Sequence, residues 1–113
     1  MCTKSQLSTI LSTVKREAER IFGDKLVEVV LYGSYARGDN DDESDIDIMV
    51  RVNIEKENLY PFNKKLSMIT SRLGVEHDIL VSIHLQDNYT FERFKKVVPF
   101  YNNVINEGIV ING

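Results

Sequence analysis

The stretch Leu31-Tyr32-Gly33-Ser34-Tyr35-Ala36-Arg37-Gly38, followed by an acidic loop and then by Ser44-Asp45-Ile46-Asp47-Ile48-Met49-Val50, decides the fold. An apolar strand ends in a Gly-Ser pair, ten residues intervene, and two aspartates open the next strand at alternate positions. Successive side chains of a strand point to opposite faces, so Asp45 and Asp47 share one face. The other face is wholly apolar and suited to packing on helices, with Ile46, Ile48, Val50 and Val52.

The Gly-Ser pair predicts a phosphate-binding turn. Gly33 has no side chain, so a ligand can approach its backbone closely. Residues Ser34 to Arg37 can begin a helical turn, whose first amide groups, together with the Ser34 hydroxyl, would donate to phosphate oxygens. We therefore predict that Gly33, Ser34 and Arg37 bind a nucleoside triphosphate. Arg37 has two interpretations, a contact with phosphate or an ion pair with the acidic loop.

The two aspartates predict a metal site. Side chains two positions apart on a strand lie roughly 6 to 7 Å apart, at about 3.3 Å per residue. That spacing suits a pair of metal ions about 3.5 to 4 Å apart. Asp45 and Asp47 are thus candidate ligands of two Mg²⁺ ions, and the positive charge needed to hold a triphosphate beside six carboxylates at positions 39 to 47 would come mainly from the metal.

Two other motifs are excluded by spacing. Gly33 and Gly38 have the separation of a P-loop, but Asp39 stands where its lysine should be. The run from Asp39 begins like an EF-hand, yet Ser44 and Val50 replace the required glycine and glutamate.

Gly33-Ser34, ten residues, and Asp45-x-Asp47 together resemble the signature of the polymerase-beta-like nucleotidyltransferase superfamily. With Ala36-Arg37-Gly38 and Ser44, the string is similar to the minimal nucleotidyltransferase branch. The resemblance runs from about Leu26 to the end, where Asp78 and Glu107-Gly108-Ile109 fit the family's third carboxylate and its closing segment. It implies an α+β fold of two layers, a small mixed sheet with helices packed on one face. It also implies a transfer of AMP from ATP that needs Mg²⁺.

The third carboxylate of this family lies on a later strand, and residues 76–82 predict that strand. Ile79 and Val81 would face the core and Asp78 the opposite side, beside Asp47. Asp78 would then be a metal ligand and the base that accepts the proton of the attacking hydroxyl. His77 and His84 are interpreted as packing or surface residues.

The rest of the sequence predicts helices and strands that support the site. Helical periodicity begins near Leu7 and stops at Gly23, strands cover 26–32 and 45–52, and a second helix runs from Pro61 to Gly74. Two further helical segments, separated by Pro99, follow the third strand, and Gly108 caps the last one.

Composition bounds the function. The 113 residues, 42% hydrophobic and 27% charged, predict a single globular domain over 1–113. A net charge of −3 argues against a nucleic-acid template. A single cysteine and no long apolar run predict a cytoplasmic protein without a signal peptide or membrane span.

The acceptor is where the sequence is least informative. The resemblance implies a HEPN-family toxin as partner, with this chain as the antitoxin and a tyrosine or similar hydroxyl as acceptor. Val30, Met49 and Leu80 are expected to form a small exposed apolar surface for that partner. Two alternatives stay open: neutralisation of a HEPN ribonuclease by contact alone, and nucleotidylation of a small molecule in a site completed by a second copy of the chain or another subunit.

Overall fold

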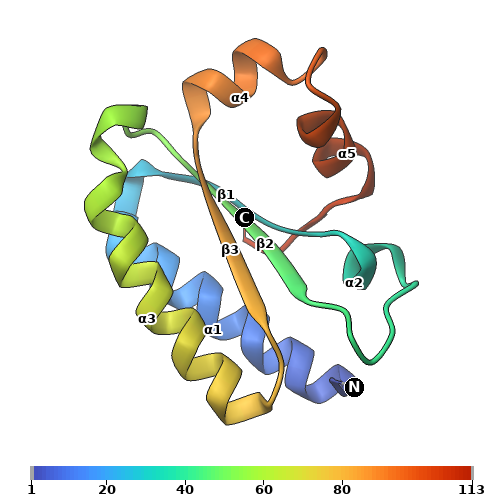
Figure 1. Ribbon diagram of the computed structural model, residues 1–113. Coiled ribbons are helices and arrows are strands. Elements are labelled where there is room, and N and C mark those ends of the chain that lie inside the picture. The colour runs from blue at the N-terminus through green and yellow to red at the C-terminus, as the bar shows by residue number, and fades with distance from the viewer. Residues whose placement is uncertain (1, 113) are drawn as a thin grey trace.

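A four-stranded mixed sheet organises the computed structural model, which describes residues 2–112 (Figure 1). The strands are β1 (Leu26–Tyr32), β2 (Ile46–Val52), β3 (Val81–Asp87) and β4 (Ile109–Val110), in the order β3-β2-β1-β4. β1 pairs antiparallel with β2 and β4, and β2 pairs parallel with β3. The predicted α+β class with a small mixed sheet is confirmed.

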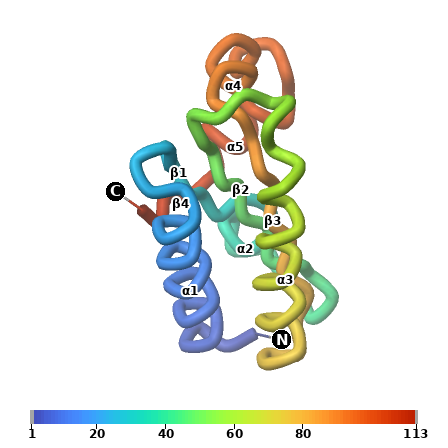
Figure 2. The backbone as a smooth tube through the Cα atoms, turned by 90° about the vertical axis from the view of Figure 1, so that its left-hand side faces the viewer, coloured from blue at the N-terminus to red at the C-terminus, as the bar shows by residue number. Residues whose placement is uncertain are grey.

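Two long helices cover one face of this sheet, α1 (Lys4–Phe22) and α3 (Tyr60–His77). Figure 2 looks onto the layer that they form, with the sheet behind it. The apolar face of β2 is fully buried there, because Ile46, Ile48 and Val50 are 0% exposed. A capping box between Thr3 and Gln6 begins α1, and Gly23 ends it as the sequence predicts. Short 3₁₀ turns occupy Gly23–Lys25 and Lys56–Asn58.

Helices also lie on the other face of the sheet, so the expected arrangement with helices on one face is incomplete. α4 (Asn88–Phe94) and α5 (Pro99–Glu107) follow β3 and pack there, whereas α2 (Ser34–Arg37) follows β1 and its Tyr35 belongs to the core on the side of α1 and α3. A second, smaller core buries Val30 and Met49 against Phe91 and Val104. The expectation of an exposed apolar surface is therefore wrong for Val30 and Met49, whereas Leu80 is 65% exposed.

The end of α3 differs from the prediction. The helix continues through Gly74 to His77, and Asp78 adopts the left-handed conformation at the C-cap, with φ +52°. Gly74 serves a different purpose: a Cβ there would lie 3.1 Å from the Ile79 carbonyl oxygen, where the chain turns back. The strand predicted over 76–82 is wrong, because β3 begins only at Val81. Among the described residues, no helix combines the length and apolarity needed to cross a membrane.

Candidate functional site

The Gly-Ser turn lies directly against the carboxylate of Asp47. β1 ends at Tyr32, and Gly33 then adopts φ +79° and ψ −157°, a conformation open essentially to glycine alone. A Cβ on Gly33 would lie 2.7 Å from Asp47 Oδ2. The amides of Ala36 and Arg37 donate to the Gly33 carbonyl, so the amides of Ser34 and Tyr35 precede the first helical hydrogen bond. The turn and the aspartate strand thus meet at one point.

Asp45 and Asp47 stand where β2 begins. The register places Asp47 opposite Tyr32 of β1 and Ser82 of β3. Burial raises the pKa of the Asp47 carboxyl, and the charge of Asp45 raises that pKa further, while Arg37 acts in the opposite direction. Ionised Asp47 is therefore costly in the folded protein, and a cation bound between the two carboxylates would relieve that cost.

Tyr32 is the neighbour of Asp47 on β1. Burial, followed by the negative charge of Asp47, raises the pKa of its phenol to about 12. Tyr32 therefore keeps its proton at neutral pH and offers a hydrogen-bond donor beside the carboxylate.

Arg37 connects α2 to α5 through ion pairs. Its Nε donates to Asp39 Oδ2 at 3.1 Å, and its Nη1 donates to Glu107 Oε2 at 3.2 Å. The hydrogen bond to Asp39 raises the pKa of the Arg37 guanidinium most, and the hydrogen bond to Glu107 raises it further. Of the two interpretations of Arg37, the ion pair with the acidic loop is present in the structure, and Glu107 adds a second partner.

A pocket of 230 Å³ opens between α2 and α5, next to the turn. It is lined by Tyr32, Gly33, Arg37, Phe100, Asn103, Val104 and Glu107. The Phe100 ring lies edge-on to Tyr32, at 5.5 Å between centroids, and to His84, at 5.3 Å. Phe100 therefore bridges from β1 to β3 above the face that carries Asp47.

The structure does not bring Asp78 to the aspartate pair. Asp78 ends α3, and the position opposite Asp47 on β3 is taken by Ser82. Within residues 2–112, no three His, Cys, Asp or Glu side chains are grouped as a metal site. The alternation of Ile79, Val81, Ile83 and Leu85 continues along the chain, so periodicity could not show where β3 begins.

Sequence reasoning missed two positions on the face of Asp47. The parallel register sets Ser82 beside Asp47 and His84 beside Met49. Neither residue belongs to a motif, and only the register of β3 reveals their place.

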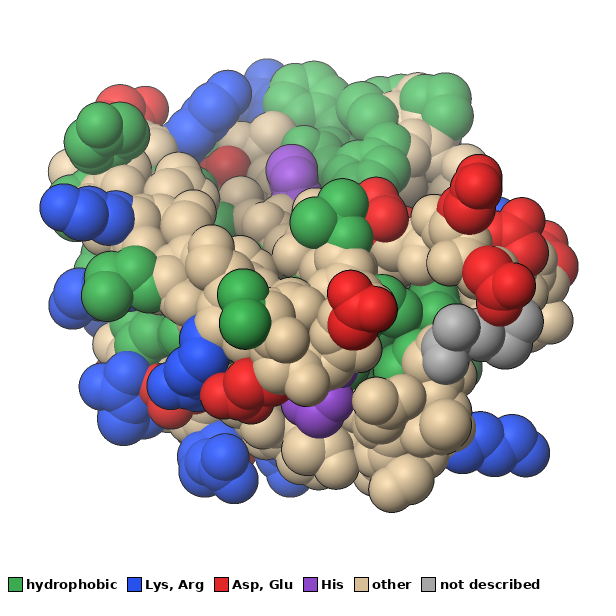
Figure 3. Space-filling view, turned by 60° about the horizontal axis from the view of Figure 1, so that its bottom comes forward, with side chains coloured by type: hydrophobic (Ala, Val, Ile, Leu, Met, Phe, Trp, Pro, Cys, Tyr) green, Lys and Arg blue, Asp and Glu red, His purple; other side chains and the backbone are tan. Residues whose placement is uncertain are grey.

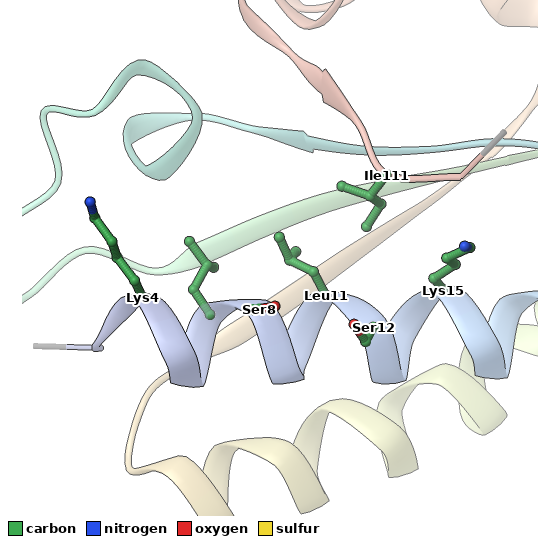
Figure 4. Close-up of a pocket in the computed structure, with 7 residues that line it drawn as sticks. Lys4, Ser8, Leu11, Ser12, Lys15 and Ile111 are labelled. Carbon is green, nitrogen blue, oxygen red and sulfur yellow. The ribbon is translucent and has the colours of Figure 1, made fainter.

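The surface separates charges of opposite sign. In Figure 3, acidic side chains gather on the right, the side of the α2–β2 loop, whereas most basic side chains lie on the left and along the lower edge. A groove of 420 Å³ runs along α1, where Leu11 and Ile111 face one another (Figure 4). Its lining contains Lys4 and Lys15 and no carboxylate, and it lies apart from the aspartate pair.

Comparison with known proteins gives consistent matches. The family model described as "Nucleotidyltransferase domain" matches residues 11–111. A "putative protein adenylyltransferase" of Methanocaldococcus jannaschii is 40% identical over 77 residues, which are 68% of this chain and 76% of that protein. The protein adenylyltransferase MntA of Thermococcus cleftensis is 29% identical over 98 residues, 87% of this chain and 96% of that protein.

Solved structures share the fold. A "putative nucleotidyltransferase" from Sulfolobus solfataricus superposes with a TM-score of 0.56 at 25% identity, covering 95% of this chain and 82% of the other. A toxin-antitoxin complex with AMP-PNP has a chain that superposes with a TM-score of 0.53 at 23% identity, covering 88% and 70%.

Proposed function

Because this chain belongs to the nucleotidyltransferase domain family and to its minimal nucleotidyltransferase branch, we propose that it transfers AMP from ATP to a hydroxyl of a HEPN-family toxin, as that toxin's antitoxin. One observation carries the proposal. The Gly33 backbone abuts Asp47 Oδ2 so closely that a Cβ would be 2.7 Å away. A turn that can receive phosphates and a carboxylate that can hold their cation are therefore adjacent.

We propose Mg²⁺ as the cofactor, held by Asp45 and Asp47. Mg²⁺ is usually bound by one or two carboxylates together with substrate phosphates, so this pair of donors fits it. Bound Mg²⁺ would neutralise phosphate charge and polarise the phosphoryl group. The prediction of a second ion shared with Asp78 loses its premise, because Asp78 stands at the end of α3.

The chain's own groups have separate roles in this proposal. The amides at the start of α2 and the Ser34 hydroxyl bind phosphate oxygens. Tyr32 keeps its phenolic proton and offers a hydrogen-bond donor beside Asp47. Arg37, in the wall of the 230 Å³ pocket, orients α2 through its bond to Glu107.

The partner is proposed from related proteins. MntA of Thermococcus cleftensis is named a protein adenylyltransferase, and one structural neighbour is a toxin-antitoxin complex with an ATP analogue. In this proposal the partner protein presents the acceptor hydroxyl at the turn.

A second candidate is an antitoxin that neutralises its toxin by contact alone. One observation favours it: within the described chain, no third acidic side chain joins Asp45 and Asp47. Nucleotidylation of a small molecule has no such observation in its favour.

Transfer of label separates these candidates. The protein is incubated with ATP labelled at the α-phosphorus, Mg²⁺, and the HEPN protein encoded by the neighbouring reading frame. We expect label on the HEPN protein, and none with Asp45→Asn, with Asp47→Asn or after removal of Mg²⁺ by EDTA. Inhibition of the toxin without label, retained by both variants, would favour contact alone.

A further inference from the structure

The face of β3 on the side of Asp47 carries an imidazole, that of His84, two residues beyond Ser82. In a parallel pair, residues in register point to the same face of the sheet. Asp47 is in register with Ser82, and Met49 is in register with His84. His84 therefore stands on the side of the sheet that bears Asp47, two residues further along the neighbouring strand.

A chain of hydrogen bonds orients the His84 ring. Gln86 is only 6% exposed, and its Nε2 donates to both the carbonyl oxygen and Oδ1 of Asp87, each at 3.2 Å. Asp87 is itself held, because its Oδ2 accepts from the Thr90 amide at 2.8 Å. These acceptors require the amide nitrogen of Gln86 at that position, which leaves Gln86 Oε1 to face His84.

The same chain selects the tautomer. His84 Nε2 lies 2.9 Å from Gln86 Oε1. A carbonyl oxygen can only accept, so Nε2 must carry the proton. Neutral imidazole has one N–H, and Nδ1 is consequently the atom with the free lone pair. Two buried residues thus fix which nitrogen of this exposed ring can accept a proton.

Access to the His84 ring is open. The residue is exposed, and the edge-on ring of Phe100 covers one side, with 5.3 Å between centroids. Titratable groups on the surrounding elements include Asp47 and Arg51 on β2, Tyr32 and Glu28 on β1, Asp87 at the end of β3, Glu92 on α4, and Tyr101 and Glu107 on α5. An incoming hydroxyl can therefore approach both Asp47 and His84 from the same face.

We propose that His84 Nδ1 accepts the proton of the hydroxyl that attacks ATP, with Gln86 as the residue that positions the ring. The proposal rests on the function proposed above. The hydroxyl oxygen forms a bond to the α-phosphorus, and the bond from that phosphorus to the oxygen of the leaving pyrophosphate breaks. The hydroxyl proton moves to Nδ1 and then to solvent, and the products are the adenylylated acceptor and pyrophosphate.

The chain offers a matched control, because His77 is its other histidine and ends α3. AMP transfer to the HEPN protein is measured for wild type, His84→Ala, His84→Gln and His77→Ala, with and without added imidazole. The Tm shift produced by MgATP is measured alongside as a test of folding and nucleotide binding.

We expect both His84 variants to keep the MgATP-induced shift and to lose about 10²-fold or more in transfer rate. Imidazole should restore transfer to His84→Ala, and His77→Ala should stay within about twofold of wild type. Transfer by His84→Ala at the rate of His77→Ala, or a loss that imidazole does not restore, would overturn the role of His84 alone. A wild-type protein that transfers no label would overturn the proposed function and this inference with it.

Discussion

Replacing Gly33 by alanine tests the contact on which the proposed site depends. The new methyl group would meet Asp47 Oδ2 at 2.7 Å, and the residue would have to keep φ +79° and ψ −157°. Backbone strain of this kind costs about 1 to 3 kcal/mol, and displacing the Asp47 carboxylate, the end of a partly exposed side chain, costs about 1 kcal/mol more, the low end for overpacking. We expect the free energy of unfolding to fall by about 3 kcal/mol, which lowers Tm by about 12 °C or more in a domain of this size.

Gly38→Ala is the matched control for this substitution. Gly38 also has positive φ, at +84°, but a Cβ there meets nothing within 4 Å. Its left-handed conformation should cost only about 1 kcal/mol. Urea denaturation of both variants therefore compares a positive-φ glycine that abuts Asp47 with one in open space.

A double-mutant cycle measures that contact directly. In an Asp47→Ala background the carboxylate is gone, and Gly33→Ala should cost only its backbone strain. We expect a coupling energy of about 1 to 2 kcal/mol between the two positions. A coupling near zero, or a Gly33→Ala variant as stable as Gly38→Ala, would refute the close approach of the turn to Asp47.

Three further predictions concern the aspartate pair and the core. Burial raises the pKa of the Asp47 carboxyl, so ionised Asp47 lowers the stability of the folded protein at any pH above that pKa. Asp47→Asn should therefore raise Tm at pH 7. Thermal melts should show that this gain in Tm disappears as the pH falls below the pKa of Asp47. MgATP should raise the Tm of wild type by mass action, and the same scan should show little shift with Asp45→Asn. Ile48 is 0% exposed, so Ile48→Ala should cost about 2 to 5 kcal/mol in urea denaturation, independently of MgATP.

The pattern of side chains along the sequence was sufficient to predict strands β1 and β2. One face of each strand carries only apolar side chains, and a shift by one residue would move that set out of the main core, so pattern and register agree. Gly33 was predictable as a close-approach position because the Gly-Ser pair stands ten residues before Asp45-x-Asp47; a glycine after a strand is by itself usually only a turn. What it approaches, the Asp47 carboxylate, follows from the antiparallel pairing of Tyr32 with Asp47.

The third strand was not predictable in the same way. Gly74 has the appearance of a helix stop, but the helix passes through it and ends at Asp78, which tolerates the left-handed conformation. The apolar alternation of this region is continuous, so it does not mark a first residue. Because the strand was predicted over 76–82, Asp78 was placed within the sheet and His84 beyond its end, whereas β3 spans Val81–Asp87.

By itself the sequence determined the fold class, the turn at Gly33 and the aspartate pair, because each depends on neighbours a few residues apart. Only the tertiary structure decided which side chains of β3 stand beside Asp47. That outcome depends on the parallel register between β2 and β3, whose partners are more than thirty residues apart along the chain. Short-range periodicity carries no information on such a pairing, in which Val81 joins the core that α3 and β2 share.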